Sequence, residues 1–293
     1  RLNVVPMFQC LLLPWLFFCG TYALLSFELR YRSPGACWAL VGLCSLVTLT
    51  CGMFALHGLW RRLRGGAQGD APTLRPPSWM AFLAVSTFAA LVLGVLLGDL
   101  NYKTNMQQYY DYVNLNEHAA IDPARMRGQE FMDAGRVYFT NASALDLRKA
   151  MGFRNLDTYC VAPITTMSSA GTPLALESYD FWAVGLGCCQ THPHMADFQC
   201  GEYANPSAHQ GLRLLRDDQR DFFRLAVQQA EATYSLKATH PLFFFWVGDA
   251  TAEMRSFHDA GYKYFFIGVL VHFAWQALCV ALAAAAFAKL GKL

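Results

Sequence analysis

The residues best suited to chemistry form one short cluster, Cys188-Cys189-Gln190-Thr191-His192-Pro193-His194, followed by Cys200. Zinc is held tetrahedrally by such side chains, usually from ligand pairs roughly two to five residues apart. The spacing of Cys189 and His192 fits a pair of this kind. Only Pro193 separates His192 from His194, however, so the cluster matches no standard zinc pattern, and we predict no metal here.

Disulfide bridges are the stronger interpretation of the same cysteines. The polar middle of the chain holds four cysteines, an even number that suits two bridges in an oxidising compartment. Because Cys188 and Cys189 are adjacent, we expect them to reach different partners, so that Cys160 and Cys200 take one each. A bridged cysteine has no thiolate to offer a metal.

A second polar pair, His272 and Gln276, lies in the middle of a long apolar segment. Residues four apart share one face of a helix. An interhelical hydrogen bond, worth about 0.6 kcal/mol, is the simpler role for such a pair. The alternative is that His272 binds a haem or a chlorophyll-type magnesium. A second histidine ligand would have to be His57, which lies at a different depth, so we predict no bound cofactor.

Motifs for catalysis are absent from the sequence: it has no nucleophile elbow, P-loop, dinucleotide fingerprint or HExxH. The carboxylates Asp111, Asp133, Asp157 and Asp180 are scattered, without the spacing of an acid–base pair. We therefore predict that the protein is not an enzyme.

Asn141-Ala142-Ser143 is a glycosylation sequon, and we predict a glycan at Asn141.

Composition indicates that membrane helices position these residues. The 293 residues are 55 % hydrophobic and 15 % charged, with mean hydropathy +0.23. Between Asp99 and Asp259 there are 19 acidic and 13 basic side chains, while the rest of the chain has 2 acidic and 10 basic ones. The net charge of +2 thus hides an acidic polar domain between basic-flanked apolar segments, a pattern that disfavours nucleic-acid binding.

Four apolar segments are long enough to cross a bilayer, which takes about 20 residues of helix. We predict transmembrane helices at about 4–27, 37–60 and 79–97 within residues 1–99, and a fourth helix in residues 264–293 with a short tail. The 61–77 loop is basic, which favours the cytoplasm. Residues 100–263 are therefore expected to form one mixed α/β extracytoplasmic domain, and the tyrosine-rich 101–116 stretch is expected to continue the third helix.

The clearest helix predicted inside that domain runs from about Ala208 to Leu236, after the start signal Asn205-Pro206-Ser207. A shorter helix is expected from Ala144 to Met151. The charged face of the longer helix is either solvated or a surface for an acidic partner. That face carries Arg213, Arg216, Arg220 and Arg224.

The aromatic run Phe243-Phe244-Phe245-Trp246 follows, too short to span a membrane. A core strand and a contact with the membrane or another subunit both explain it. We assign these four residues, with the four arginines, to partner contact.

Two resemblances accompany these patterns. The four spans, the short first and large second outer loops, and the double cysteine of Gly187-Cys188-Cys189-Gln190 resemble the tetraspanin plan. Tetraspanins carry Cys-Cys-Gly instead, so the likeness is one of topology. The segments 179–185, 222–232 and 238–244 are similar to an uncharacterised family of multi-pass membrane proteins of dinoflagellate algae. That resemblance implies no activity, but it implies a thylakoid or other organellar membrane as an alternative to the plasma membrane or endomembranes.

The sequence as a whole predicts an accessory or scaffold subunit of a membrane complex, which docks through its spans and its outer domain. Its partners would be membrane lipids and other membrane protein subunits. Small and polar residues in the spans, such as Gly94 and Gly98, favour helix packing. The alternatives are a cofactor-binding electron-transfer or light-harvesting subunit that uses His272, and a channel or transporter component.

Overall fold

The computed structural model describes residues 4–64, 77–190 and 197–290. Residues 65–76 of the predicted cytoplasmic loop, as well as His192 and His194, lie outside the described residues. The chain divides into a helical unit, residues 1–107 with 258–293, and a sheet unit, residues 108–257. The sheet unit is thus slightly shorter than the expected domain of residues 100–263.

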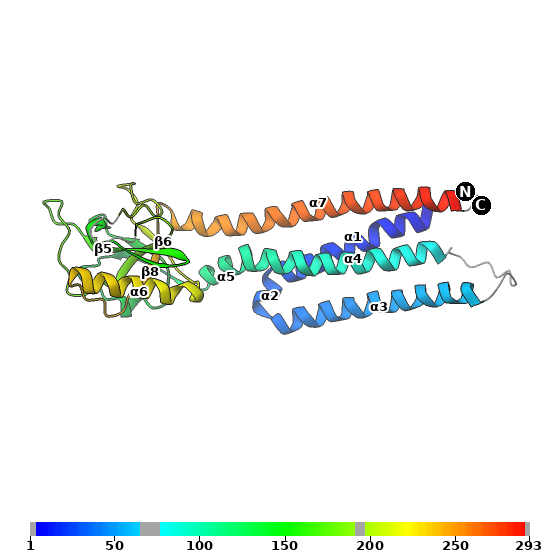
Figure 1. Cartoon of the computed structure of the whole chain (residues 1–293), viewed down its shortest axis with the longest axis horizontal. Helices are drawn as coiled ribbons and strands as arrows, with labels where there is room; N and C mark the ends of the chain where they lie inside the picture. Colours follow the sequence, from blue (N-terminus) through cyan, green and yellow to red (C-terminus); the bar gives the residue numbers. More distant parts are fainter. Residues whose placement is uncertain (1–3, 65–76, 191–196, 291–293) are drawn as a thin grey trace. The chain divides into compact units, whose positions relative to one another are not determined.

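The helical unit contains four helices that are long and apolar enough to cross a membrane, as predicted. Figure 1 shows them as the long coiled ribbons α1, α3, α4 and α7. The helices are α1 (Val4–Ser26), α2 (Glu28–Arg32), α3 (Pro34–Arg64), α4 (Pro77–Asn101), the π-helix η1 (Tyr102–Met106), α5 (Gln107–Val113) and α7 (Ala250–Leu290). Through η1 and α5 the third span continues to Val113, as expected.

Two glycines let α1 and α4 approach each other closely. A Cβ atom at Gly98 would lie 2.7 Å from the Cβ of Leu25, and one at Gly94 would overlap the hydroxyl of Thr21. Their four-residue spacing places both on one face of α4. This is the close backbone packing that small residues give to membrane helices. Gly94 and Gly98 thus serve packing within the chain, and docking of another subunit through the spans stays a prediction.

Hydrogen bonds connect α1 to α7. The Trp15 indole donates to the carbonyl of Val269 at 3.1 Å, and the Tyr22 hydroxyl donates to that of Tyr264 at 3.1 Å. By contrast, α3 contacts mainly α4, and Val41, Thr48 and Ala55 are among its buried residues. The rest of α3 exposes large apolar side chains, among them Leu43, Leu46, Leu49, Phe54 and Leu56.

The sheet unit is a mixed eight-stranded sheet with the order β1-β2-β7-β8-β6-β5-β3, and β4 also pairs with β5. The pairs β1–β2 and β6–β8 are parallel and the others antiparallel. The strands are β1 (Asn116–Ile121), β2 (Ala134–Phe139), β3 (Ser143–Leu145), β4 (Met151–Asn155), β5 (Asp157–Thr166), β6 (Phe181–Leu186), β7 (Gln210–Arg213) and β8 (Leu242–Val247); short helices η2 (Gly128–Phe131) and η3 (Leu147–Lys149) lie between them.

Both faces of the central strands are buried. On one face, Ile164, Phe181 and Phe244 join a core that loop residues such as Phe198 complete. On the other face, Trp182 and Phe243 pack against α6 (Asp217–Tyr234), which lies along the sheet in Figure 1. Strands buried on both sides read as continuous apolar runs in the sequence.

Two local predictions are wrong. The helix expected from Ala208 begins only at Asp217, because Gln210–Arg213 forms β7 between β2 and β8. Tertiary pairing thus overrides the local start signal at Asn205-Pro206-Ser207. The helix expected from Ala144 to Met151 is instead β3, the single 3-10 turn η3 and the start of β4.

The glycine contact on α4 leads to a first prediction. Gly98→Ala should destabilise the helical unit by about 1–3 kcal/mol, because the added methyl group overpacks against Leu25. Gly42→Ala on α3 is the matched control, since nothing lies within 4 Å of a Cβ atom there. Thermal unfolding of the purified protein in detergent measures both. Equal melting temperatures for the two variants would contradict the close contact between α1 and α4.

Candidate functional site

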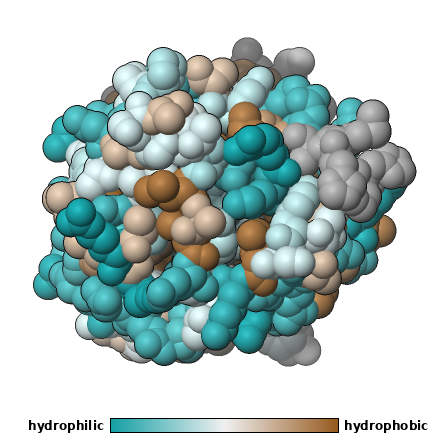
Figure 2. Space-filling view, turned by 90° about the vertical axis from the view of Figure 1, so that its left-hand side faces the viewer, coloured by the Kyte–Doolittle hydropathy of each residue, from teal (hydrophilic) through white to brown (hydrophobic). Residues whose placement is uncertain are grey.

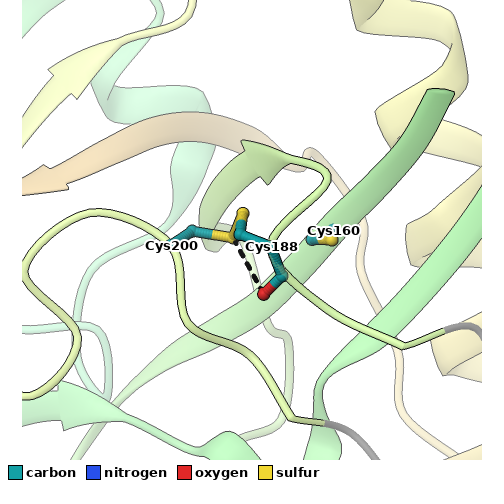
Figure 3. A group of neighbouring side chains, drawn as sticks. All are labelled: Cys160, Cys188 and Cys200. Carbon is teal, nitrogen blue, oxygen red and sulfur yellow. Dashed lines mark hydrogen bonds between the residues drawn. A yellow bond between two sulfur atoms is a disulfide. The ribbon is translucent and has the colours of Figure 1, made fainter.

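Both predicted disulfide bridges are present, and the structure decides their pairing. Cys160 on β5 is bonded to Cys189, and Cys188 is bonded to Cys200. Figure 3 shows Cys160, Cys188 and Cys200 gathered at one point, although they come from separate segments of the chain. The adjacent cysteines thus have different partners, as expected.

Glycines on the neighbouring strands make room for the bridges. Cys160 pairs in register with Gly152 of β4 on one side and with Gly185 of β6 on the other. A Cβ atom at Gly185 would lie 2.6 Å from the sulfur of Cys188, and one at Gly152 would lie 2.9 Å from that of Cys189. The two glycines flank Cys160 on the neighbouring strands, and the space they leave lets both bridges pack against the sheet.

A group with the spacing of metal ligands occurs in this cluster. The sulfur atoms of Cys160, Cys188 and Cys200 lie within 4.8 Å of one another. All three are in disulfides, so in this state they carry no thiolate that could bind a metal.

The aromatic run does not form a contact surface, which corrects its assignment to partner contact. Phe243, Phe244 and Trp246 are at most 4 % exposed, and Phe245 is half-buried. They form β8 in the middle of the sheet, where alternate side chains enter opposite cores. The core strand, which the sequence left open as an alternative, is the observed structure.

The four arginines do not share a helix face. Arg213 lies on β7, half-buried, with its guanidinium 5.6 Å from the ring centre of Phe244. Burial lowers the pKa of Arg213 to about 10, with a smaller contribution from the charge of Arg220. Arg216 precedes α6 and pairs with Asp218 at 2.9 Å. Only Arg220 and Arg224 are exposed on the helix itself, and partner contact through them stays a prediction.

His272 and Gln276 are buried between helices. The His272 ring stacks on Phe18 with its centre 4.1 Å away, and the Gln276 amide donates to the carbonyl of Cys10 at 2.7 Å. His272 is 6 % exposed, and its Nδ1 has no hydrogen-bond partner. These contacts give both side chains a packing role, and cofactor binding by His272 stays an untested hypothesis.

Asn141 is exposed on a turn between β2 and β3, where a glycan would have room.

A polar pocket of about 260 Å³ opens beside the start of β6, and sequence reasoning missed it. Several of its polar groups are already paired: Arg127 contacts Glu177 at 2.5 Å, and His240 contacts the amide of Gln129. The pocket is lined by Arg127, Gln129, Glu177, Ser178, Asp180, Lys237, Thr239 and His240.

Asp180 is the best-connected group in the pocket and is only 3 % exposed. Its carboxylate accepts hydrogen bonds from the Ser178 hydroxyl at 2.6 Å and from the backbone N–H groups of Gly128, Thr239 and His240 at 3.0–3.2 Å. Burial alone would raise the pKa of Asp180, but these four donors outweigh it and hold the pKa below the ordinary value. A carboxylate so fully bonded is a poor general base, and its role here is structural.

The tip of the β4–β5 hairpin presents a different kind of feature, also missed from the sequence. Asn155 and Asp157 face each other in the ladder, and Leu156 between them is 98 % exposed. Its φ of 60° lies in the left-handed region, where a leucine costs about 1–2 kcal/mol. A large apolar side chain is thus held in water, in a conformation that suits glycine or asparagine.

Other surface features surround that tip. Leu186, which pairs with Tyr159 beside the hairpin, is 42 % exposed, while Arg154, Asn155 and Asp157 supply exposed polar groups. Figure 2 views the sheet-unit side of the molecule and shows a mainly hydrophilic surface broken by a few hydrophobic side chains. An apolar centre with a polar rim is typical of a protein contact.

Comparison of the chain with protein-family models, with curated proteins and with solved structures finds no match.

The hydrogen bonds of Asp180 predict an acid-sensitive fold. Because its pKa is lower in the folded state, the charged form stabilises the fold above the ordinary Asp pKa of about 3.9, and this stabilisation is lost as the pH falls through the folded-state value. Asp180→Asn should lower the free energy of unfolding by an amount on the order of 3 kcal/mol at neutral pH. It should also weaken the loss of stability at acidic pH. Melting temperatures from pH 3 to 7 measure both effects. If the melting temperature of the variant falls at acidic pH as steeply as that of the wild type, Asp180 is not the group responsible.

The packing of His272 predicts that a ring of similar size can replace it. His272→Phe removes a buried nitrogen that has no hydrogen bond and keeps the stack on Phe18, so the stability of the helical unit should stay equal or rise. Thermal unfolding in detergent checks this. An absorption spectrum of the same sample tests the cofactor hypothesis, which requires visible absorbance that the variant loses.

Proposed function

We propose that this protein is an accessory subunit of a membrane protein complex, and that its sheet unit docks a partner through the tip of the β4–β5 hairpin. The observation that carries the proposal is Leu156, which is 98 % exposed and has a positive φ. The positive φ reduces the stability of the free protein, and the exposed side chain contributes no burial to offset that cost. Burying a leucine side chain in a partner gains about 1.5–3 kcal/mol, which gives the residue a use in a complex.

The partner has a definable chemistry. A single leucine on a narrow hairpin fits an apolar pocket rather than a flat surface. Arg154 and Asp157 flank it with charges of opposite sign, so the pocket rim should offer hydrogen-bonding groups more than one net charge. Leu186 adds a second apolar contact at the edge.

In this proposal the four long helices cross the membrane and contact lipids and other membrane subunits. The sheet unit lies on the extracytoplasmic side of the plasma membrane or an endomembrane. Two disulfides support this side, because such bridges persist in oxidising compartments. The basic residues of the short loops support it as well. In a thylakoid or other organelle, the same unit would face the lumen, and Asn141 would carry no glycan.

Catalysis has little support among the described residues. Asp180 is saturated with hydrogen bonds, Arg127 is paired with Glu177, and the disulfides hold the four cysteines of the sheet unit. The proposal is therefore a binding role.

Leu156→Gly provides the test. Glycine tolerates positive φ, so the variant should unfold at the same temperature as the wild type or higher, and the removal of the apolar tip should abolish assembly. Mild-detergent extraction of the tagged chain from its native membrane, followed by native gel electrophoresis, measures assembly. The wild type should migrate as a defined complex larger than the free chain, and the variant as the free chain.

Met132→Gly is the matched control, because Met132 is another apolar side chain on the sheet unit, 61 % exposed. It should leave the complex intact. The proposal fails if the wild type migrates as the free chain, if both variants assemble normally, or if both lose assembly equally. A coloured wild-type band would favour the cofactor-binding alternative, and charge movement by the protein in liposomes would favour the channel or transporter alternative.

A further inference from the structure

The four bridged cysteines differ in their exposure to solvent. Cys160 is 0 % exposed and Cys200 is 3 % exposed. Cys188 and Cys189 are half-buried and follow each other in the chain. An external thiol can therefore reach each bridge only at its half-buried sulfur, at Cys188 in one and at Cys189 in the other.

The two bridges also lie within reach of each other. The sulfurs of Cys160 and Cys200, which belong to different bridges, are within 4.8 Å. Gly185 is the register partner of Cys160, and a Cβ atom there would lie 2.7 Å from the sulfur of Cys200. Because Gly185 has no side chain, no Cβ atom at that position crowds the sulfur of Cys200 beside Cys160.

We propose that this cluster is a thiol–disulfide exchange site, with a thiol as its substrate and a Cys160–Cys200 bridge as its two-electron-reduced product. Exchange proceeds by attack of a thiolate on a disulfide sulfur. The substrate thiolate attacks the sulfur of Cys188, the Cys188–Cys200 bond breaks, and Cys200 leaves as a thiolate. The Cys200 thiolate attacks the sulfur of Cys160, the Cys160–Cys189 bond breaks, and Cys189 leaves as a thiolate.

A second substrate thiol completes the reaction. It attacks the substrate sulfur bound to Cys188, forms the substrate disulfide and releases the Cys188 thiolate. Two substrate thiols thus lose two electrons and two protons in total, which the chain takes up as the thiols of Cys188 and Cys189. One bridge, Cys160–Cys200, remains between the two buried cysteines.

The reduced state therefore changes which segments are joined. Cys188 and Cys189, which directly follow β6, lose their covalent attachments, while β5 becomes attached to Cys200 further along the same connection. The new bridge is buried at both ends, which protects it from further thiol.

Mapping the product of partial reduction tests the proposal. The purified full chain in detergent receives one equivalent of dithiothreitol, and free thiols are then trapped with N-ethylmaleimide at mildly acidic pH. Digestion and mass spectrometry identify the labels. We expect one peptide with labels on both Cys188 and Cys189, and a linked peptide pair that joins Cys160 to Cys200.

Three other outcomes would overturn it. Labels on Cys188 and Cys200 with Cys160–Cys189 intact would show simple reduction of one bridge, and labels on Cys160 and Cys189 would show reduction of the other. A mixture of fully reduced and fully bridged chains would show that no exchange intermediate forms. The double variant Cys160→Ser with Cys189→Ser lacks the acceptor bridge, so after reduction both remaining cysteines of the sheet unit, Cys188 and Cys200, should carry labels; if it does not fold, the wild-type map still decides. The six free cysteines of the helices are labelled in every sample and are left out of the comparison.

Discussion

The side chain of Asp180 keeps a negative charge inside the sheet unit, where hydrogen bonds must replace the lost water. Its donors come from three segments: Gly128, Ser178, and the pair Thr239 and His240. Its backbone carbonyl also accepts from the N–H of Leu242 at 2.7 Å, where the parallel pair β6–β8 begins. Parallel strands need a long connection. Asp180 fixes the point at which that connection returns to the sheet, so the register of both central strands depends on it.

The helical unit could be predicted from the sequence because its constraint is local. A run of about 20 residues without charge has few structural options other than a spanning helix. The ends of the helices were less predictable, since a helix can continue into water. The last one begins at Ala250 and carries Glu253, Arg255 and Asp259 before the apolar run at Tyr264.

The sheet was harder to predict because the deciding contacts join distant residues. An aromatic run such as Phe243–Trp246 has the same local pattern whether it is a strand buried on both faces or an exposed surface. Strand β7 has only four residues, and it forms because β2 and β8 offer hydrogen bonds on both sides. Nothing in the local sequence distinguishes Asp180 from the other carboxylates, because its hydrogen-bond donors come from distant segments of the chain. Leu156 becomes unusual only when the hairpin gives it a positive φ and full exposure.

The exposed leucine and the crosslinks occupy the same end of the sheet. Cys160 lies on β5 only four residues beyond Leu156, and the N–H of Gly187 donates to the carbonyl of Thr158 at 2.8 Å. The Cys160–Cys189 bridge and this hydrogen bond thus hold the base of the hairpin. A rigid base reduces the entropy that docking would cost, because the tip is already ordered before a partner arrives. Exchange of the bridges would release Cys188 and Cys189 and move the covalent attachment of β5 to Cys200, so the redox state of the cluster would act beside the surface that docking uses.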